Sequence, residues 1–214
     1  MSLQSGDTSK MVAHAIIVVG VSTGGLKPLR RIIEALPPEC GASVFVVMHS
    51  GASSSILPEI LGWHGRISVS FATDYALIEA AHVYVAPPDH HMVVDIDRIR
   101  LNRGPKVHGT RPAADPLFVS AANAHGNRVV GVVLSGEGAD GAAGLVAIKA
   151  CGGRALVEDP RDAPVPSMPE AAVAADSPEA LQIDALADRV AELCSLVHSG
   201  RAVDLSLRDQ TVPP

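Results

Sequence analysis

The sequence predicts an α/β fold: a modified doubly wound, mostly parallel sheet with helices on both faces and an inserted β-hairpin. Short β-rich runs, most of them continuously apolar, alternate with segments that carry helical periodicity. Continuous apolar runs are typical of strands that are buried on both faces, as parallel strands are. Apolar residues make up 47% of the 214 residues and charged residues 19%, which is a globular composition with enough apolar side chains for a core.

Five apolar runs are predicted to be strands of this sheet. They cover residues 15–19, 43–48, 82–86, 129–134 and 155–157. The alternation of strand and helix is interrupted once, where two shorter runs at 91–95 and 98–102 follow each other closely. Such a pair predicts a β-hairpin attached to the α/β frame.

Five segments with helical periodicity lie between or after these strands. They cover residues 26–36, 55–63, 115–126, 144–151 and 184–199. The strands and helices together predict one α/β domain over residues 14–199. The mostly polar ends, 1–13 and 200–214, are expected to be a flexible leader and a flexible tail.

Composition argues against several classes of partner. The formal net charge is −6 and aromatic residues make up 3%, so the chain lacks both the positive excess and the stacking platforms of a nucleic-acid-binding protein. The apolar stretch near the start is too short to cross a membrane, so no membrane insertion is expected. Three scattered cysteines without CxxC spacing favour a reducing, cytoplasmic location.

Polar residues with complementary chemistry follow three of the predicted strands. Ser22 comes after the first strand, His49 after the second, and Asp140 lies in the glycine-rich segment after 129–134. Sites in doubly wound sheets form outside the carboxyl ends of the strands. A serine becomes a nucleophile when a histidine removes its proton and a carboxylate fixes the histidine tautomer. The glycines around Ser22 are suited to expose its hydroxyl beside N–H groups that can bind an oxyanion.

Each of these residues also has a plainer interpretation. Ser22 precedes a predicted helix, as N-cap residues do, and its turn GVSTGG could cradle phosphate although it matches neither GxGxxG nor a Walker loop. His49 could be a structural histidine, and Asp140 could cap the helix that follows it. The nine histidines show no paired ligand spacing, so no metal site is predicted.

Six segments, in order and without a large gap, resemble the catalytic domain of bacterial chemotaxis protein-glutamate methylesterases. They are GVSTGG, VFVVMHS, VYVAPPDHHM, RPAADPLFVSAA, GVVLSGEGADGAAGL and PSMPEAA, within residues 14–198. The resemblance implies a triad of Ser22, His49 and Asp140 that works without a cofactor. It further implies hydrolysis of glutamate γ-methyl esters on chemoreceptors through an acyl-serine intermediate, with release of methanol. Some members also deamidate receptor glutamines.

The resemblance also assigns residues around the triad. Thr23, with Gly24, is implied to shape the oxyanion pocket, and Arg111 and Asp115 fall in the segment on the substrate side. Glu137 stands where the family usually has methionine, and it brings a negative charge near the site.

The chain is too short to hold the receiver domain that usually precedes this esterase domain. A free-standing, divergent member is therefore expected. Its substrate would be a methylated chemoreceptor or related signalling protein, and its regulator a separate response-regulator partner. Glu137 leaves an alternative open, because a carboxylate beside a forming oxyanion disfavours the transition state. The alternative is a catalytically impaired module of the same fold that binds receptors. A third hypothesis is a nucleotide-binding protein that uses the glycine-rich turn.

Overall fold

The computed structural model describes residues 15–49, 55–63 and 65–198. The predicted leader and tail lie outside the described residues, so the predicted limits of the domain stay predictions. In the described part of the chain, no helix is long and apolar enough to span a membrane.

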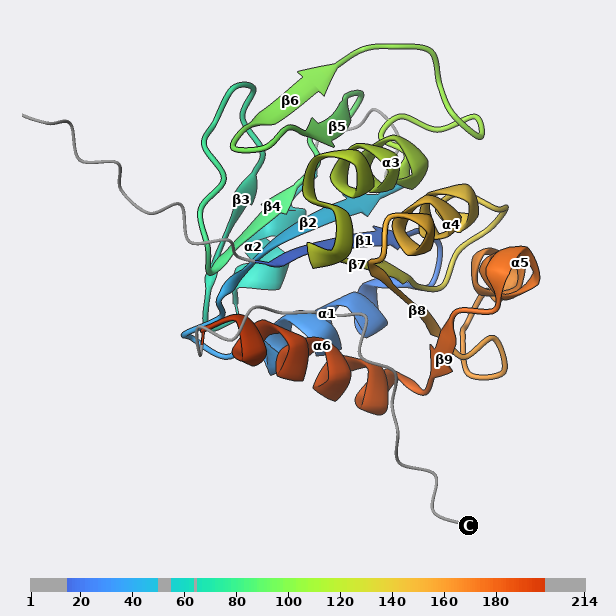
Figure 1. The fold of residues 1–214 in the computed structure, drawn as a ribbon. Coiled ribbons are helices and arrows are strands. Elements are labelled where there is room, and N and C mark those ends of the chain that lie inside the picture. Colours follow the sequence, from blue (N-terminus) through green and yellow to red (C-terminus); the bar gives the residue numbers. More distant parts are fainter. Residues whose placement is uncertain (1–14, 50–54, 64, 199–214) are drawn as a thin grey trace, which may run out of the picture.

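The main sheet has the strand order β3-β4-β2-β1-β7-β8-β9, and every neighbouring pair in it is parallel (Figure 1). From the central strand β1 the chain continues to β2 on one side and later to β7 on the other. The strand order therefore reverses between β1 and β7, which confirms the doubly wound prediction and defines the topological switch point. The strands are β1 (Ala15–Val21), β2 (Ala42–Met48), β3 (Ser68–Phe71), β4 (His82–Val85), β7 (Val129–Val133), β8 (Arg154–Glu158) and β9 (Glu179–Leu181).

Helices cover both faces of the sheet, as predicted (Figure 1). One face carries α1 (Leu26–Ala35), α2 (Leu57–Gly62) and α6 (Ile183–His198). The other carries α3 (Ala114–His125), α4 (Ala142–Ala150) and α5 (Ser167–Asp176), with a short 3-10 turn, η1 (Gly126–Arg128), after α3. The predicted hairpin is present: β5 (His91–Val94) and β6 (Ile99–Asn102) pair antiparallel as a separate sheet that packs on α3.

The alternation of side chains along the central strands divides the core into two layers. Ile17 and Val19 of β1 pack on the α1 and α6 side, whereas Ile16 and Val18 pack on the α3 and α4 side. Both faces of β1 are buried, which explains its continuous apolar run. In β2 the odd-numbered residues face α3, as Phe45 does. Even-numbered positions of β1 and odd-numbered positions of β2 therefore share one face of the sheet.

Two strands and one α-helix were not predicted, and each has a weak sequence signal. β3 and β9 are short edge strands whose residues are exposed or half-buried, so neither forms an apolar run. α5 has a proline near its start, and its apolar residues are not gathered on one side of the helix.

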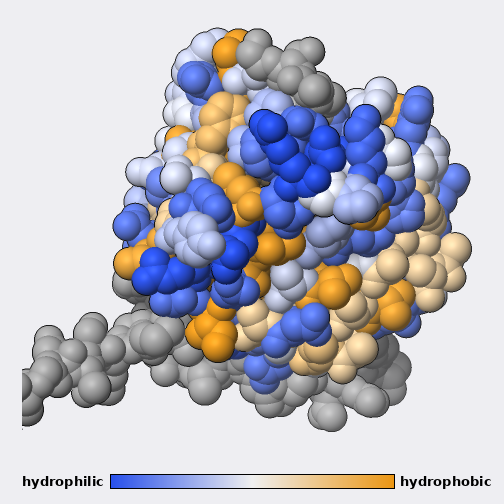
Figure 2. Space-filling view, turned by 90° about the horizontal axis from the view of Figure 1, so that it is seen from above, coloured by the Kyte–Doolittle hydropathy of each residue, from blue (hydrophilic) through white to orange (hydrophobic). Residues whose placement is uncertain are grey.

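On the side of α3 and the hairpin, the molecular surface consists of small hydrophilic and small hydrophobic patches that lie next to one another (Figure 2).

Candidate active site

The turn that carries Ser22 lies at the topological switch point. The N–H of Ser22 donates to the carbonyl oxygen of Ser135, which follows β7, at 3.0 Å. The N–H of Gly25 donates back to the carbonyl oxygen of Ser22 at 3.1 Å and closes the turn. The N-cap of α1 is Gly25, three residues after Ser22. The interpretation of Ser22 as an N-cap is therefore wrong.

Glycines allow other segments to approach this turn closely. Gly24 has φ +79°, a backbone conformation that favours glycine, and a Cβ there would lie 2.8 Å from Pro164. A Cβ on Gly136 would lie 2.5 Å from the Cβ of Ser22 and would also collide with the sulfur of Met168. The segment after β7 thus packs directly against the serine because it has no side chain at this point.

His49 is the direct neighbour of Ser22 across the sheet. Its N–H donates to the carbonyl oxygen of Val21 at 3.0 Å, so the pairing of β1 with β2 continues one residue past the strands. The shared face described above directs both side chains toward α3. Ser22 is buried and the side chain of His49 is 10% exposed. Among the described residues, no hydrogen bond joins Ser22 Oγ to the His49 ring.

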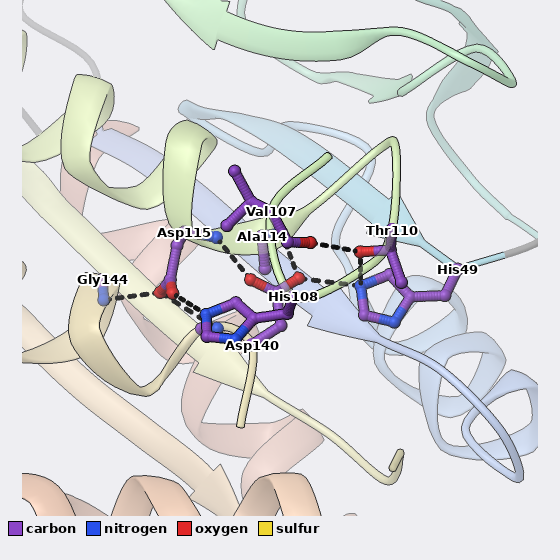
Figure 3. Close-up of polar contacts among 9 residues, drawn as sticks. His49, Val107, His108, Thr110, Ala114, Asp115, Asp140 and Gly144 are labelled. Carbon is purple, nitrogen blue, oxygen red and sulfur yellow. Dashed lines mark hydrogen bonds and ion pairs between the residues drawn. The ribbon is translucent and has the colours of Figure 1, made fainter. Parts of the chain in front are cut away.

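Asp140 provides the carboxylate partner of His49. The Nε2 atom of His49 lies 2.7 Å from Asp140 Oδ2 (Figure 3). Asp140 also accepts hydrogen bonds from the N–H groups of Ala114 at 2.6 Å and Asp115 at 2.9 Å. These two N–H groups belong to the first turn of α3, whereas the N-cap of α4 is Gly141, the residue after Asp140. The interpretation of Asp140 as a cap of the helix that follows it is therefore wrong: it caps α3.

The surroundings of Asp140 keep its carboxylate charged. Burial alone would raise the pKa of the Asp140 carboxyl group. The hydrogen bonds from His49, Ala114 and Asp115 outweigh burial and hold this pKa below its ordinary value. A charged carboxylate accepts the Nε2–H of His49 and thereby leaves Nδ1 as the nitrogen that can take a proton.

Thr110 is a neighbour of this pair that the sequence did not single out. Its Oγ1 lies 3.4 Å from His49 Nε2 and donates to the carbonyl oxygen of Val107 at 3.0 Å. A cavity of about 110 Å³ lies beside His49, and Lys106, Thr110 and Arg111 are among its lining residues. A threonine in a loop has no sequence signal that separates it from other surface threonines.

The remaining predicted residues lie around the same edge. Thr23, Gly24 and Glu137 are exposed, so the carboxylate of Glu137 is not buried against the serine. Arg111 lines the cavity, but its guanidinium donates to Asp89 Oδ1 at 2.6 and 3.0 Å and to the carbonyl oxygen of Gly104 at 2.7 Å. Hydrogen bonding to Arg111 lowers the pKa of Asp89.

Asp115 is buried, and its carboxylate is fully engaged. Oδ1 accepts from the N–H groups of Gly141 at 3.0 Å and Gly144 at 2.8 Å, and Oδ2 lies 2.8 Å from His108 Nε2. His108, Asp115 and Asp140 are close enough together to be considered as metal ligands. All four carboxylate oxygens of the two aspartates already meet protein donors, so this group is satisfied without a cation.

The fold and the site define a class: a doubly wound α/β domain that gathers a serine, a histidine and an aspartate at its switch point, the residue types that serine hydrolases use. A family model described as CheB methylesterase matches residues 17–190. The chain belongs to the CheB methylesterase family, a family of hydrolases. The resemblance seen in the sequence is thereby confirmed.

Individual relatives agree with this assignment. Over 170 residues the chain is 35% identical to a putative protein-glutamate methylesterase/protein-glutamine glutaminase of Leptospira interrogans, covering 77% of this chain and 86% of that protein. Over 167 residues it is 38% identical to a Pyrococcus horikoshii protein named protein-glutamate methylesterase/protein-glutamine glutaminase, covering 75% of this chain and 45% of that protein. The chain thus spans about half the length of several relatives.

A solved structure extends the comparison to the fold. The catalytic domain of the Thermotoga maritima CheB methylesterase matches with a TM-score of 0.81 and 28% sequence identity, covering 84% of this chain and 98% of that chain. The match covers nearly all of the catalytic domain, which confirms the predicted α/β architecture.

Proposed function

We propose that this protein hydrolyses γ-methyl esters of glutamate on a chemoreceptor or a related signalling protein, and deamidates glutamine at such sites, with Ser22, His49 and Asp140 as its catalytic residues. The observation that carries the proposal is the hydrogen-bonded His49–Asp140 pair next to Ser22, in a chain of the CheB methylesterase family. The family membership supports this reading of the glycine-rich turn over a nucleotide-binding one.

The proposed reaction begins with attack of Ser22 Oγ on the side-chain carbonyl carbon. His49 Nδ1 takes the hydroxyl proton, while Asp140 holds Nε2–H at 2.7 Å and stabilises the imidazolium that forms. The tetrahedral intermediate expels methanol, or ammonia from an amide, and His49 returns the proton to this leaving group. Water then attacks the acyl-serine with His49 as base, which releases the glutamate side chain and regenerates Ser22.

The developing oxyanion needs N–H donors that are not already used. The N–H of Gly25 is committed to the carbonyl oxygen of Ser22. The N–H groups of Thr23 and Gly24, on the exposed part of the turn, are the proposed donors. Each such donor contributes on the order of 10²–10³-fold in rate, and a general base about 10²–10⁴-fold.

The exposed position of Glu137 removes the argument for the alternative, a catalytically impaired module that binds receptors. It rested on a negative charge at Glu137 beside the forming oxyanion, and Glu137 is exposed to solvent. Water screens an exposed charge strongly, so its effect on the oxyanion is small. A separate response-regulator partner in the cytoplasm remains part of the proposal, with the methylated receptor as substrate.

The test is methanol release from a methylated chemoreceptor segment. Ser22→Ala and His49→Ala should lower kcat by on the order of 10⁴–10⁶-fold, because the triad acts as a unit. Ser195→Ala is the matched control, since Ser195 is exposed on α6. A serine-reactive phosphonate should label Ser22 and no residue of the Ser22→Ala variant. Wild-type turnover by Ser22→Ala would refute the mechanism.

A further inference from the structure

Near His49, the N-termini of α3 and α4 are each capped by an aspartate from the start of the other helix. Asp140, which precedes α4, accepts from the N–H groups of Ala114 and Asp115 in the first turn of α3. In return, the carboxylate of Asp115 accepts from the N–H groups of Gly141 and Gly144 at the start of α4 (Figure 3 shows Asp115 with Gly144). Each aspartate thus caps the helix that the other one begins.

This reciprocal capping gives hydrogen-bond partners to backbone N–H groups at the helix N-termini, which would be costly to bury without a partner. The first N–H groups of an α-helix have no partner within the helix. Neither α3 nor α4 has a side-chain cap from its own N-cap residue, Ala113 or Gly141. Both helix dipoles point their positive ends at these carboxylates, which offsets the repulsion between two buried negative charges.

Asp115 also joins the two loops that face His49. The first loop runs from Ser135 to Gly141 and carries Asp140; its glycines 138 and 141 have φ of +88° and +92°. The second is the turn 107–110, in which His108 binds Asp115 at 2.8 Å and Thr110 approaches His49. Glycine-rich loops do not hold a side chain in place by themselves, so the fixed position of Asp140 must come from these contacts.

We infer that Asp115 is a positioning residue that fixes Asp140 against His49, and that it does not contact the substrate. Asp115 is buried, and the three partners of its carboxylate, Gly141, Gly144 and His108, leave no carboxylate oxygen for a ligand. This role replaces the substrate-side role that the sequence resemblance implied for Asp115. The kinetic part of the inference rests on the proposed methylesterase function, whereas the geometric part does not.

Two substitutions separate a positioning role from substrate binding. Asp115→Ala removes the acceptor of the Gly141 and Gly144 N–H groups, and we expect kcat to fall by about tenfold to hundredfold with KM unchanged, as a displacement of about 1 Å would cause. Asp115→Asn keeps one carboxamide oxygen for these two groups, so kcat and KM should stay close to the wild-type values. Asp188→Ala, at an exposed position of α6, is the matched control.

A second measurement needs no turnover. The proton on Nε2 of His49 sits in a short hydrogen bond to Asp140 and should give a downfield ¹H NMR resonance. The resonance should persist in Asp115→Asn and in the control, and disappear in a folded Asp115→Ala protein. Its persistence in folded Asp115→Ala would overturn the inference.

The outcomes remain distinguishable if part of the scheme fails. If the wild type releases no methanol, the proposed function fails while the resonance still decides the role of Asp115. If Asp115→Ala does not fold, Asp115→Asn decides. In Asp115→Asn, a wild-type KM together with the resonance supports positioning, whereas a raised KM with the resonance intact means that Asp115 contacts substrate and overturns the inference.

Discussion

Replacing Gly136 by alanine would push a methyl group into the turn that carries Ser22. The new Cβ would lie 2.5 Å from the Cβ of Ser22, whereas carbon atoms in ordinary contact are about 3.5–4.0 Å apart. The backbone of Gly136 cannot move away freely, because its N–H donates to Val165 and its carbonyl oxygen accepts from Met168, both at 2.9 Å. Ser22 must therefore shift by about 1 Å.

Such a shift affects stability and chemistry to different extents. Overpacking of this kind lowers the unfolding free energy by about 1–3 kcal/mol. A displacement of about 1 Å at a reacting atom lowers the rate by about 100-fold. Gly136→Ala should therefore remain folded at 25 °C while phosphonate labelling of Ser22 and methanol release both fall by about two orders of magnitude.

Gly138→Ala is the matched control in the same loop. Gly138 has φ +88°, and a Cβ there would have no neighbouring atom within 4 Å, so alanine costs about 1–2 kcal/mol of backbone strain but displaces no neighbour. Urea unfolding should thus show comparable losses for both variants, while only Gly136→Ala loses labelling. A folded Gly136→Ala protein that is labelled at the wild-type rate would refute the reasoning.

Two further predictions concern residues that support the Ser22 turn. Ser135→Ala removes a hydroxyl that donates to the carbonyl oxygen of Thr23 and accepts from the N–H of Val165, each at 2.9 Å, so urea titration should show a loss of about 1–3 kcal/mol. Ser195→Ala should change stability by less than about 0.5 kcal/mol, and equal losses in the two variants would contradict the prediction. Burial raises the pKa of Glu158, whose carboxylate accepts from the Ser135 N–H at 2.8 Å. Between its unfolded and folded pKa values the folded state binds more protons, so wild-type stability falls as pH rises through this window. Glu158→Gln keeps a hydrogen-bond acceptor and removes the charge. The unfolding free energy of this variant should exceed that of the wild type at pH 7 and converge with it below about pH 4. Parallel curves of stability against pH for the two proteins would count against the argument.

Ser22 and His49 could be predicted because their positions follow from strand periodicity. A buried parallel strand appears as a continuous apolar run, and the residue after it lies at the carboxyl edge of the sheet. The five predicted strands and five predicted helices occur within a few residues of their expected limits. The edge strands β3 and β9 could not be predicted in this way, since a half-exposed strand of three or four residues carries almost no apolar signal.

The role of Asp115 could not be predicted, because it depends on how two helices pack. Asp115 and Gly141 are 26 residues apart, and their contact exists only where the starts of α3 and α4 meet. The approach requires small residues: a Cβ on Gly144 would collide with the ring and Cβ of Phe118, and a Cβ on Gly20 would lie 2.7 Å from the Cβ of Ala114. Single-sequence reasoning finds the aspartate but not its partners.

The position of Asp140 joins the stability of the fold to the chemistry proposed for it. The same carboxylate accepts the first N–H groups of α3 and the Nε2–H of His49. Since the N-terminus of a helix favours negative charge, α3 helps to keep Asp140 ionised against burial, which raises its pKa. The pairing of β1 with β2 places Ser22 and His49 side by side, whereas the contact between the starts of α3 and α4 fixes the position of Asp140. A substitution of Asp115 therefore acts on the histidine through Asp140.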